Sequence, residues 1–280
     1  MLAVAGTSLA ATINVPADYT TIQDAVDAAS GGDVILVAPG TYTGTGDEVV
    51  STDGKAITIK ASGTPEETII DGEGARRVVY CSSGEGPDTI IEGFTITGGS
   101  NSYGGGIYCS SSNPTITGCT ISDNTANYSG GGIYCSGGSS PTISGCTISG
   151  NTANYGGGIH CDLNSSPTIT DCTISGNTAN YGGGIYCSGG SDHDDTPTLT
   201  DTVVCGNAPD QIYPVDGWTD NGGNTASDEC PIRADGVVDE YDLQTLLGLW
   251  DTDDTAGDID GDGTVGISDL LAMLVNWGPC

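Results

Sequence analysis

The sequence predicts an all-β fold in which three short strands per coil stack into a parallel β-helix. The first sign is a repeat: the run Gly-Gly-Gly-Ile-Tyr-Cys at residues 104–109 returns three times at steps of 26 residues, with His replacing Tyr in one copy. A fixed period of this length is typical of units that bury a face only against their neighbours. The second sign is that the intervening runs are rich in Thr and Ile, with apolar residues two apart, which is the spacing of strands.

A corner divides the Thr- and Ile-rich run of each unit into two strands. Ile116 and Cys119 are three residues apart, so strict alternation cannot turn both of them inward. Glycine and aspartate tolerate the left-handed conformation that a sharp corner needs. They occupy this corner in successive units: Gly118, Gly145 and Asp171 each precede a cysteine, and Asp201 precedes Thr202, which takes the place of the cysteine. One unit is therefore predicted to form three strands, with neighbouring coils about 4.8 Å apart.

Stacking of the coils places equivalent residues directly above one another. Three inward columns are predicted: Cys81, Cys109, Cys135, Cys161 and Cys187; Phe94, Cys119, Cys146 and Cys172; and Ile107, Ile133, Ile159 and Ile185. Because no CxxC spacing occurs, we interpret these cysteines as small apolar core residues and not as a redox or metal site.

The region before the clear repeats is predicted to close the N-terminal end of the β-helix. Thr20 or Thr21 caps a short amphipathic helix that ends at the glycines 31–32, and this helix would cover unpaired strand edges. Residues 1–12 are interpreted as the remnant of a secretion signal, and an ordinary N-terminal strand is the alternative.

The charge distribution excludes several classes of partner. The chain has 37 acidic and five basic residues, a net charge of -32, and no Lys or Arg between Arg77 and Arg233. Nucleic acid and anionic membrane surfaces are therefore not expected as partners, and no apolar stretch is long enough to span a membrane. An anionic polysaccharide would be repelled unless cations bridge it, which leaves a neutral polysaccharide as the expected carbohydrate partner.

Near the C-terminus, residues 258–269 match the pattern of an EF-hand calcium loop. Gly263 allows the sharp turn that folds alternate side chains onto one hard cation. The predicted Ca²⁺ ligands are Asp258, Asp260, Asp262, Thr264 (through its carbonyl) and Asp269. A degenerate copy lies 27 residues upstream, with Pro231 and Arg233 in place of two ligands. We therefore expect one calcium site.

These motifs resemble two known families. The segments at residues 16–25 and 37–42, together with the repeats, resemble right-handed parallel β-helix proteins of the pectin-lyase-like superfamily over residues 13–225. The two loop-helix units of residues 226–280 resemble a GC-type dockerin, with a helix after each loop. The resemblance implies a secreted or cell-surface bacterial protein that docks to a cohesin-like or other surface partner. Cys230 and Cys280 flank this module, and a disulfide between them is expected if the protein is secreted.

Aromatic side chains form the first candidate site. Tyr80, Tyr108, Tyr134, His160 and Tyr186 should form an outward column on one sheet. Tyr103, Tyr128, Tyr155 and Tyr181 should form another beside the glycines. Rows of this kind, in particular Tyr80, Tyr108, Tyr134 and Tyr186, can stack on sugar rings. The alternative is a tyrosine ladder that only stabilises its sheet.

One acidic region is the candidate for catalysis. His160 and Asp162 lie two apart on one coil, so they can face the same side. Asp192, Asp194 and Asp195 lie in an insertion on the next coil and would provide further carboxylates for acid–base chemistry or a second metal. The alternative is a solvated acidic loop.

Three functional hypotheses follow. The leading one is a non-catalytic surface or scaffold-associated protein that binds polysaccharide, because the repeats are nearly uncharged and carry tyrosine rows. The alternative is a polysaccharide lyase or glycoside hydrolase that uses the His160 region. A purely structural adhesin is the third.

Overall fold

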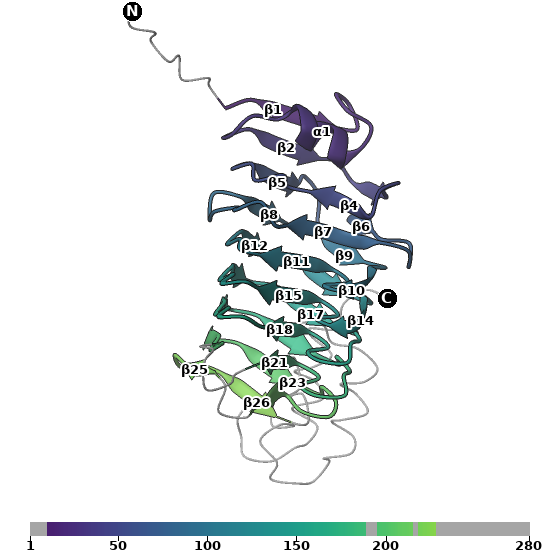
Figure 1. Cartoon of the computed structure of the whole chain (residues 1–280). Coiled ribbons are helices and arrows are strands. Elements are labelled where there is room, and N and C mark those ends of the chain that lie inside the picture. Colours follow the sequence, from purple (N-terminus) through teal and green to yellow (C-terminus); the bar gives the residue numbers. More distant parts are fainter. Residues whose placement is uncertain (1–9, 189–194, 215–217, 228–280) are drawn as a thin grey trace, which may run out of the picture.

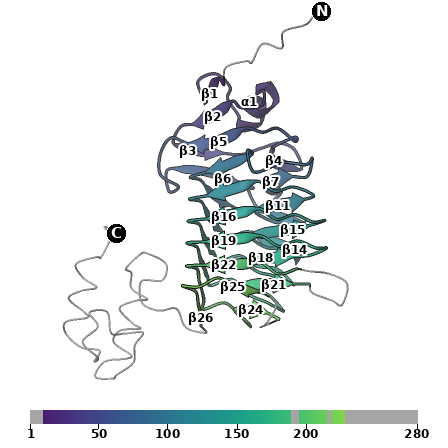
Figure 2. The same cartoon turned by 90° about the vertical axis from the view of Figure 1, so that its left-hand side faces the viewer.

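The computed structural model describes residues 10–188, 195–214 and 218–227. Over these residues three parallel sheets wind around one elongated core, and the strands of each sheet lie one above another (Figure 1). The view turned by 90° shows β16, β19 and β22 in one stack and β15, β18 and β21 in a second stack across the core (Figure 2).

Within the described residues, sheets A, B and C contain nine, eight and seven strands, because the coils at the two ends do not contribute a strand to every sheet. Sheet A consists of β1 (Thr12–Val15), β2 (Val34–Val37), β5 (Thr58–Ala61), β8 (Ile90–Glu92), β12 (Thr115–Thr117), β16 (Thr142–Ser144), β19 (Thr168–Thr170), β22 (Thr198–Thr200) and β25 (Thr219–Asp220). Sheet B consists of β3 (Gly40–Tyr42), β6 (Thr68–Asp71), β9 (Thr95–Thr97), β13 (Thr120–Ser122), β17 (Thr147–Ser149), β20 (Thr173–Ser175), β23 (Val203–Cys205) and β26 (Thr225–Ser227). Sheet C consists of β4 (Glu48–Ser51), β7 (Arg77–Cys81), β11 (Ile107–Ser110), β15 (Ile133–Ser136), β18 (Ile159–Cys161), β21 (Ile185–Cys187) and β24 (Ile212–Tyr213). A short ladder pairs β10 (Ser100–Tyr103) with β14 (Thr125–Ser129).

The helix α1 (Ile22–Ala28) lies at the N-terminal end of the β-helix (Figure 1). Its N-cap is Thr21, whose side-chain oxygen accepts a hydrogen bond from the Asp24 backbone N–H at 3.0 Å. Ile22, Ala25 and Val26 are buried, and the helix contacts β1, β2 and β4. The expected helix is therefore present, whereas its role in protecting the strand edges stays a prediction.

The predicted register of the coils is confirmed. Cys109 pairs with Cys81 on one side and with Cys135 on the other, and Cys161 pairs with Cys135 and Cys187. All five cysteines are buried. The corner residues also adopt the expected left-handed backbone, with φ of 59° at Gly118, 58° at Gly145, 53° at Asp171 and 47° at Asp201.

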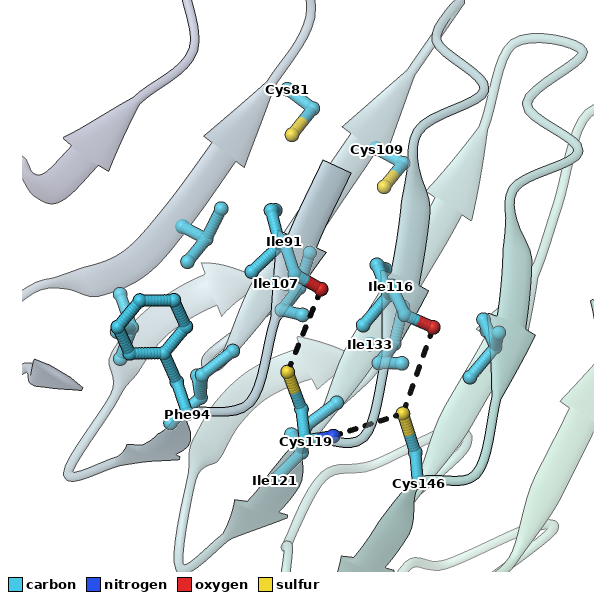
Figure 3. Close-up of a cluster of buried hydrophobic side chains, with 14 of the residues drawn as sticks. Cys81, Ile91, Phe94, Ile107, Cys109, Ile116, Cys119, Ile121, Ile133 and Cys146 are labelled. Atoms are coloured by element: carbon cyan, nitrogen blue, oxygen red, sulfur yellow. Dashed lines mark hydrogen bonds between the residues drawn. The ribbon is translucent and has the colours of Figure 1, made fainter. Parts of the chain in front are cut away.

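The cysteines behave as core residues. The Cys119 and Cys146 side chains lie among buried isoleucines, and the Cys119 thiol donates to the Ile91 carbonyl at 3.7 Å (Figure 3). The neighbouring Cys187 thiol and burial both raise the pKa of Cys161, which keeps that thiol protonated. Cys205 is disulfide-bonded, and the other described cysteines are free. The predicted pair Cys230–Cys280 lies outside the described residues.

An asparagine column runs beside the core and was not predicted. Each of its members donates through Nδ2 to a carbonyl of the preceding coil and to the amide oxygen of the next column residue, at 2.8–3.0 Å. The column consists of Asn124, Asn151, Asn177 and Asn207 and ends on Gln211. Buried amides that are fully paired in this way fix the register of neighbouring coils.

Candidate functional site: a surface of stacked tyrosines

The outer face of sheet C carries one aromatic side chain per coil. Successive strand residues point to opposite faces, so the residue before each inward cysteine points outward. Strand pairing places Tyr108 between Tyr80 and Tyr134, and His160 between Tyr134 and Tyr186. The predicted alignment of this column is confirmed, and Tyr213 extends it by one coil. The inner aromatic column thus consists of Tyr80, Tyr108, Tyr134, His160, Tyr186 and Tyr213.

A second column of tyrosines lies beside the first, just before the glycine runs. This outer aromatic column consists of Tyr103, Tyr128, Tyr155 and Tyr181. The glycines let the chain pass closely between the two columns. A Cβ atom on Gly131 would lie 2.6 Å from the Gly157 carbonyl oxygen, and one on Gly104 would lie 2.9 Å from Tyr108 Cβ. Only glycine fits these positions without a shift of backbone.

The two columns form one network of ring contacts. Within the inner column, neighbouring centroids are 4.9–5.5 Å apart. Within the outer column, the Tyr103–Tyr128 and Tyr155–Tyr181 centroids are 5.6 and 5.5 Å apart. The columns are joined where Tyr103 meets Tyr134 at 5.3 Å and Tyr155 meets Tyr186 at 5.2 Å. Pairs at these separations stabilise beyond their buried area by about 0.5–1.5 kcal/mol each.

Exposure divides the rings into a supporting layer and a contact layer. Tyr134 and His160 are only 6% and 4% exposed, because outer-column rings pack against them. The outer column is 38–54% exposed, and Tyr213 is 40% exposed. Of the four tyrosines predicted to stack on sugars, Tyr134 is therefore buried, and Tyr80, Tyr108 and Tyr186 are half-buried. The rings that face solvent are mainly those of the outer column.

Arg77 ends the aromatic stack at its N-terminal side. Its guanidinium carbon lies 4.9 Å from the Tyr80 ring centroid and 4.4 Å from that of Tyr108, which is cation–π distance. The same group donates to the carbonyl oxygens of Tyr103 and Gly104 at 2.8 and 3.1 Å. Arg77 therefore ties the start of both columns together.

His160 takes a tyrosine position in the inner column. Its Nε2 lies 2.7 Å from Ser188 Oγ, and its Nδ1 is buried without a hydrogen-bond partner among the described residues. Burial lowers the pKa of His160 to about 4, although the nearby charge of Asp162 opposes the shift. At neutral pH the ring is therefore uncharged.

Asp162 and Asp195 have structural partners. The Tyr134 hydroxyl donates to Asp162 Oδ2 at 3.0 Å, and the Leu163 N–H donates to Oδ1 at 2.9 Å. Asp195 Oδ1 accepts from the Ser165 N–H at 2.7 Å. This bond closes a column of buried serines in which each N–H donates to the next hydroxyl: Ser112, Ser139 and Ser165.

The other sequence-based sites fall outside the described residues. These are Asp192, Asp194, Cys230, Cys280 and the calcium ligands Asp258, Asp260, Asp262, Thr264 and Asp269. Within the described ranges, no group of three or more His, Cys, Asp or Glu side chains is placed to hold a metal ion. Nor does any helix in those ranges have the length and apolar character needed to cross a membrane.

The model of one family matches the chain. The family is described as "Right handed beta helix region", and its model matches residues 68–228, more than half of the chain. The chain belongs to this family.

Individual similarities are partial. A cell surface glycoprotein of Methanothermus fervidus, an archaeon, is 32% identical over 127 residues, which cover 45% of this chain and 18% of that protein. The crystal structure of pectate lyase Pel9A matches with a TM-score of 0.51 and 16% identity, over 79% of this chain and 60% of the lyase. Pectin methylesterase PemA from Erwinia chrysanthemi matches with a TM-score of 0.49 and 14% identity, over 76% of this chain and 70% of PemA. The chain thus spans less than two thirds of the length of the surface glycoprotein and of the lyase. At 16% identity, the similarity to the lyase shows a shared fold alone.

Proposed function

We propose that this protein is a non-catalytic polysaccharide-binding protein of the cell surface. The observation that carries the proposal is the continuous aromatic surface on sheet C, whose outer-column rings are 38–54% exposed. Large exposed rings that are already held in place by their neighbours contact a ligand at little cost in side-chain entropy. A row of such rings, repeated at each coil, suits a long and repetitive ligand.

Charge selects the kind of polysaccharide. The chain has a net charge of -32, which repels polyanions. The described coils from Tyr103 onward carry no Lys or Arg that would pair with a uronate or sulfate group. A neutral polysaccharide therefore fits this surface better than an acidic one.

The candidate catalytic groups support a structural reading of that region. The Asp162 carboxylate accepts from Tyr134 and from the Leu163 N–H, and Asp195 closes the serine column. The His160–Ser188 contact repeats, one coil further on, the relation between Tyr134 and Asp162. These side chains are therefore engaged in contacts between neighbouring coils. For this reason we favour a binding function over a catalytic one.

Location and docking rest on separate observations. The partial similarity to a cell surface glycoprotein supports a position outside the cell or on its surface. We also propose that residues 226–280 bind one Ca²⁺ and dock the β-helix to a cohesin-like or other surface partner. The support is the loop pattern of residues 258–269. Calorimetric titration should show one strong calcium site that is lost in Asp260→Ala, whereas two equal sites would contradict the ligand assignment.

A paired binding and turnover assay tests the polysaccharide proposal. The full chain is run by affinity electrophoresis through gels that contain xylan, mannan, mixed-linkage glucan or pectate, and each polymer is assayed for new reducing or unsaturated ends. We expect a neutral polymer to retard the protein without product release. If the wild-type chain releases product and the double variant Asp162→Ala, Asp194→Ala does not, the protein is an enzyme. Retardation by pectate alone would contradict the neutral ligand.

A further inference from the structure

A polar pocket lies at the N-terminal end of the aromatic surface, beside the first ring of the inner column. Its volume is about 480 Å³, which is within the range of small-molecule sites. Its polar and aromatic lining consists of Asp47, Glu48, Arg76, Arg77, Tyr80 and Asn101. Glu48, Arg77 and Tyr80 lie on the paired strands β4 and β7 of sheet C, Asp47 and Arg76 directly precede these strands, and Asn101 lies on β10, so the fold brings three coils to one site.

The pocket wall is held in place before any ligand arrives. Arg77 donates to Asn101 Oδ1 at 3.2 Å and stacks on the Tyr80 ring. Asn101 Oδ1 also accepts from the Ser102 N–H at 2.7 Å. Arg76 forms an ion pair with Glu73 and donates to the Gly46 carbonyl at 3.2 Å. Side chains fixed in this way lose little freedom when they bind a ligand.

Two polar groups of the pocket remain available to a ligand. No described group donates a hydrogen bond to the Glu48 carboxylate, which is half-buried. Its pKa is raised by burial, and the charge of Arg77 opposes that shift. The Nδ2 of Asn101 likewise donates to no other described residue, because the bonds of that side chain are all made through Oδ1. The pocket thus offers a strong acceptor and a donor beside an aromatic ring.

The balance of charge indicates an uncharged ligand. Asp47 and Glu48 offset Arg76 and Arg77 within the lining, so the pocket has no net charge. A carboxylate acceptor, an amide donor and a neighbouring ring complement the hydroxyl groups and the apolar face of a sugar. An acidic sugar would meet the Glu48 carboxylate and the negative charge of the whole chain.

We propose that this pocket binds one neutral sugar residue of a polysaccharide that lies along the aromatic surface. The proposal rests on the function proposed above and adds to it a specificity site. The tyrosines contact the chain at each coil, and Glu48 and Asn101 recognise the hydroxyl groups of the residue at the end of the surface.

The test uses two conservative variants of the full chain. Glu48→Gln keeps the shape of the acceptor but removes its charge, and Asn101→Asp keeps the oxygen that Arg77 contacts but removes the donor. Isothermal titration is performed with xylohexaose, mannohexaose, cellohexaose and a galacturonate hexasaccharide. We expect one of the neutral hexasaccharides to bind, and we expect each variant to raise the Kd for this hexasaccharide by about tenfold. The exposed Glu66→Gln, on another part of the coil, is the matched control and should leave the Kd unchanged.

Each outcome decides between the two proposals. If a neutral hexasaccharide binds with the same affinity to Glu48→Gln and Asn101→Asp, the pocket proposal is overturned and the aromatic surface still stands as the binding site. Tighter binding of the galacturonate hexasaccharide, weakened by Arg76→Gln, would overturn the choice of a neutral sugar. If the wild-type chain binds none of the four probes, both proposals fail. Near-ultraviolet circular dichroism reports whether the tyrosine stack survives in each variant.

Discussion

Acid should destabilise this protein through His160 in particular. The ring is buried in the inner aromatic column with a pKa of about 4, against an ordinary value of 6.5. Its folded-state pKa is depressed, so the unfolded chain binds the proton more readily than the folded one. The stability that the neutral ring contributes is therefore present above pH 6.5 and is lost as the pH falls towards 4.

The size of the effect follows from the shift in pKa. A difference of about 2.5 pH units at about 1.4 kcal/mol per unit gives about 3 kcal/mol of lost stability by pH 4. Replacing His160 with Tyr restores the residue that the neighbouring coils carry and removes the titrating group. The free energy of unfolding of wild type minus that of His160→Tyr should then fall by about 3 kcal/mol between pH 7.5 and pH 4.

Urea denaturation followed by tyrosine fluorescence measures this difference at several pH values. The subtraction cancels the titration of the acidic residues that both chains share. Tyr186→Phe, which changes the neighbouring ring without adding or removing a histidine, should differ from wild type by an amount that does not change between pH 7.5 and pH 4. A constant difference for His160→Tyr over this range, or a His160 pKa near 6.5 by NMR titration, would refute the reasoning.

Two further predictions concern the packing of the coils. Gly131→Ala should prevent correct stacking, because its Cβ would lie 2.6 Å from a backbone oxygen of the next coil. Gly145→Asp should be close to neutral, because equivalent corners carry Asp. Thermal unfolding of both variants distinguishes steric conflict from loss of flexibility, and equal melting temperatures of the two variants would contradict the steric explanation. Asn151→Ala removes the acceptor of two hydrogen bonds from Asn124 and should cost about 3 kcal/mol in a denaturant titration, against less than about 0.5 kcal/mol for the exposed Asn127→Ala. A similar cost for both asparagine variants would contradict the ladder.

The sequence was sufficient to predict the core, because the repeat places equivalent residues of successive coils next to one another. Once the 26-residue period is seen, parallel stacking places Cys109 on Cys135 and Ile107 on Ile133 without further information. The corner positions were also predictable, since only Gly and Asp occur at the corner, before Cys119, Cys146, Cys172 and the equivalent Thr202. The repeated asparagine of each unit was visible, but its inward direction depends on the path of the turn, which alternation does not specify.

The functional surface was predicted only in part. The inner aromatic column was found because it lies on regular strands, where alternation sets its direction. Which tyrosines face solvent depends on how the loops before the glycine runs fold back. The greater exposure of Tyr103 and Tyr155 compared with Tyr134 of the inner column was therefore not predictable. The pocket around Glu48 and Asn101 was missed because its residues lie in early coils that depart from the repeat. Its only sequence signal was the adjacent pair of arginines at residues 76–77.

The affinity of a neutral polysaccharide for a chain altered at the outer aromatic column tests the central claim most directly. Tyr155 and Tyr181 stack on each other and face solvent, whereas Tyr19, which at 38% is as exposed as Tyr155, lies between β1 and α1 and belongs to neither aromatic column. Replacing Tyr155 and Tyr181 together with Ala should weaken binding at least tenfold in affinity electrophoresis, and Tyr19→Ala should leave it unchanged. Equal binding by the double variant and the wild type would show that the stacked tyrosines only support their sheet.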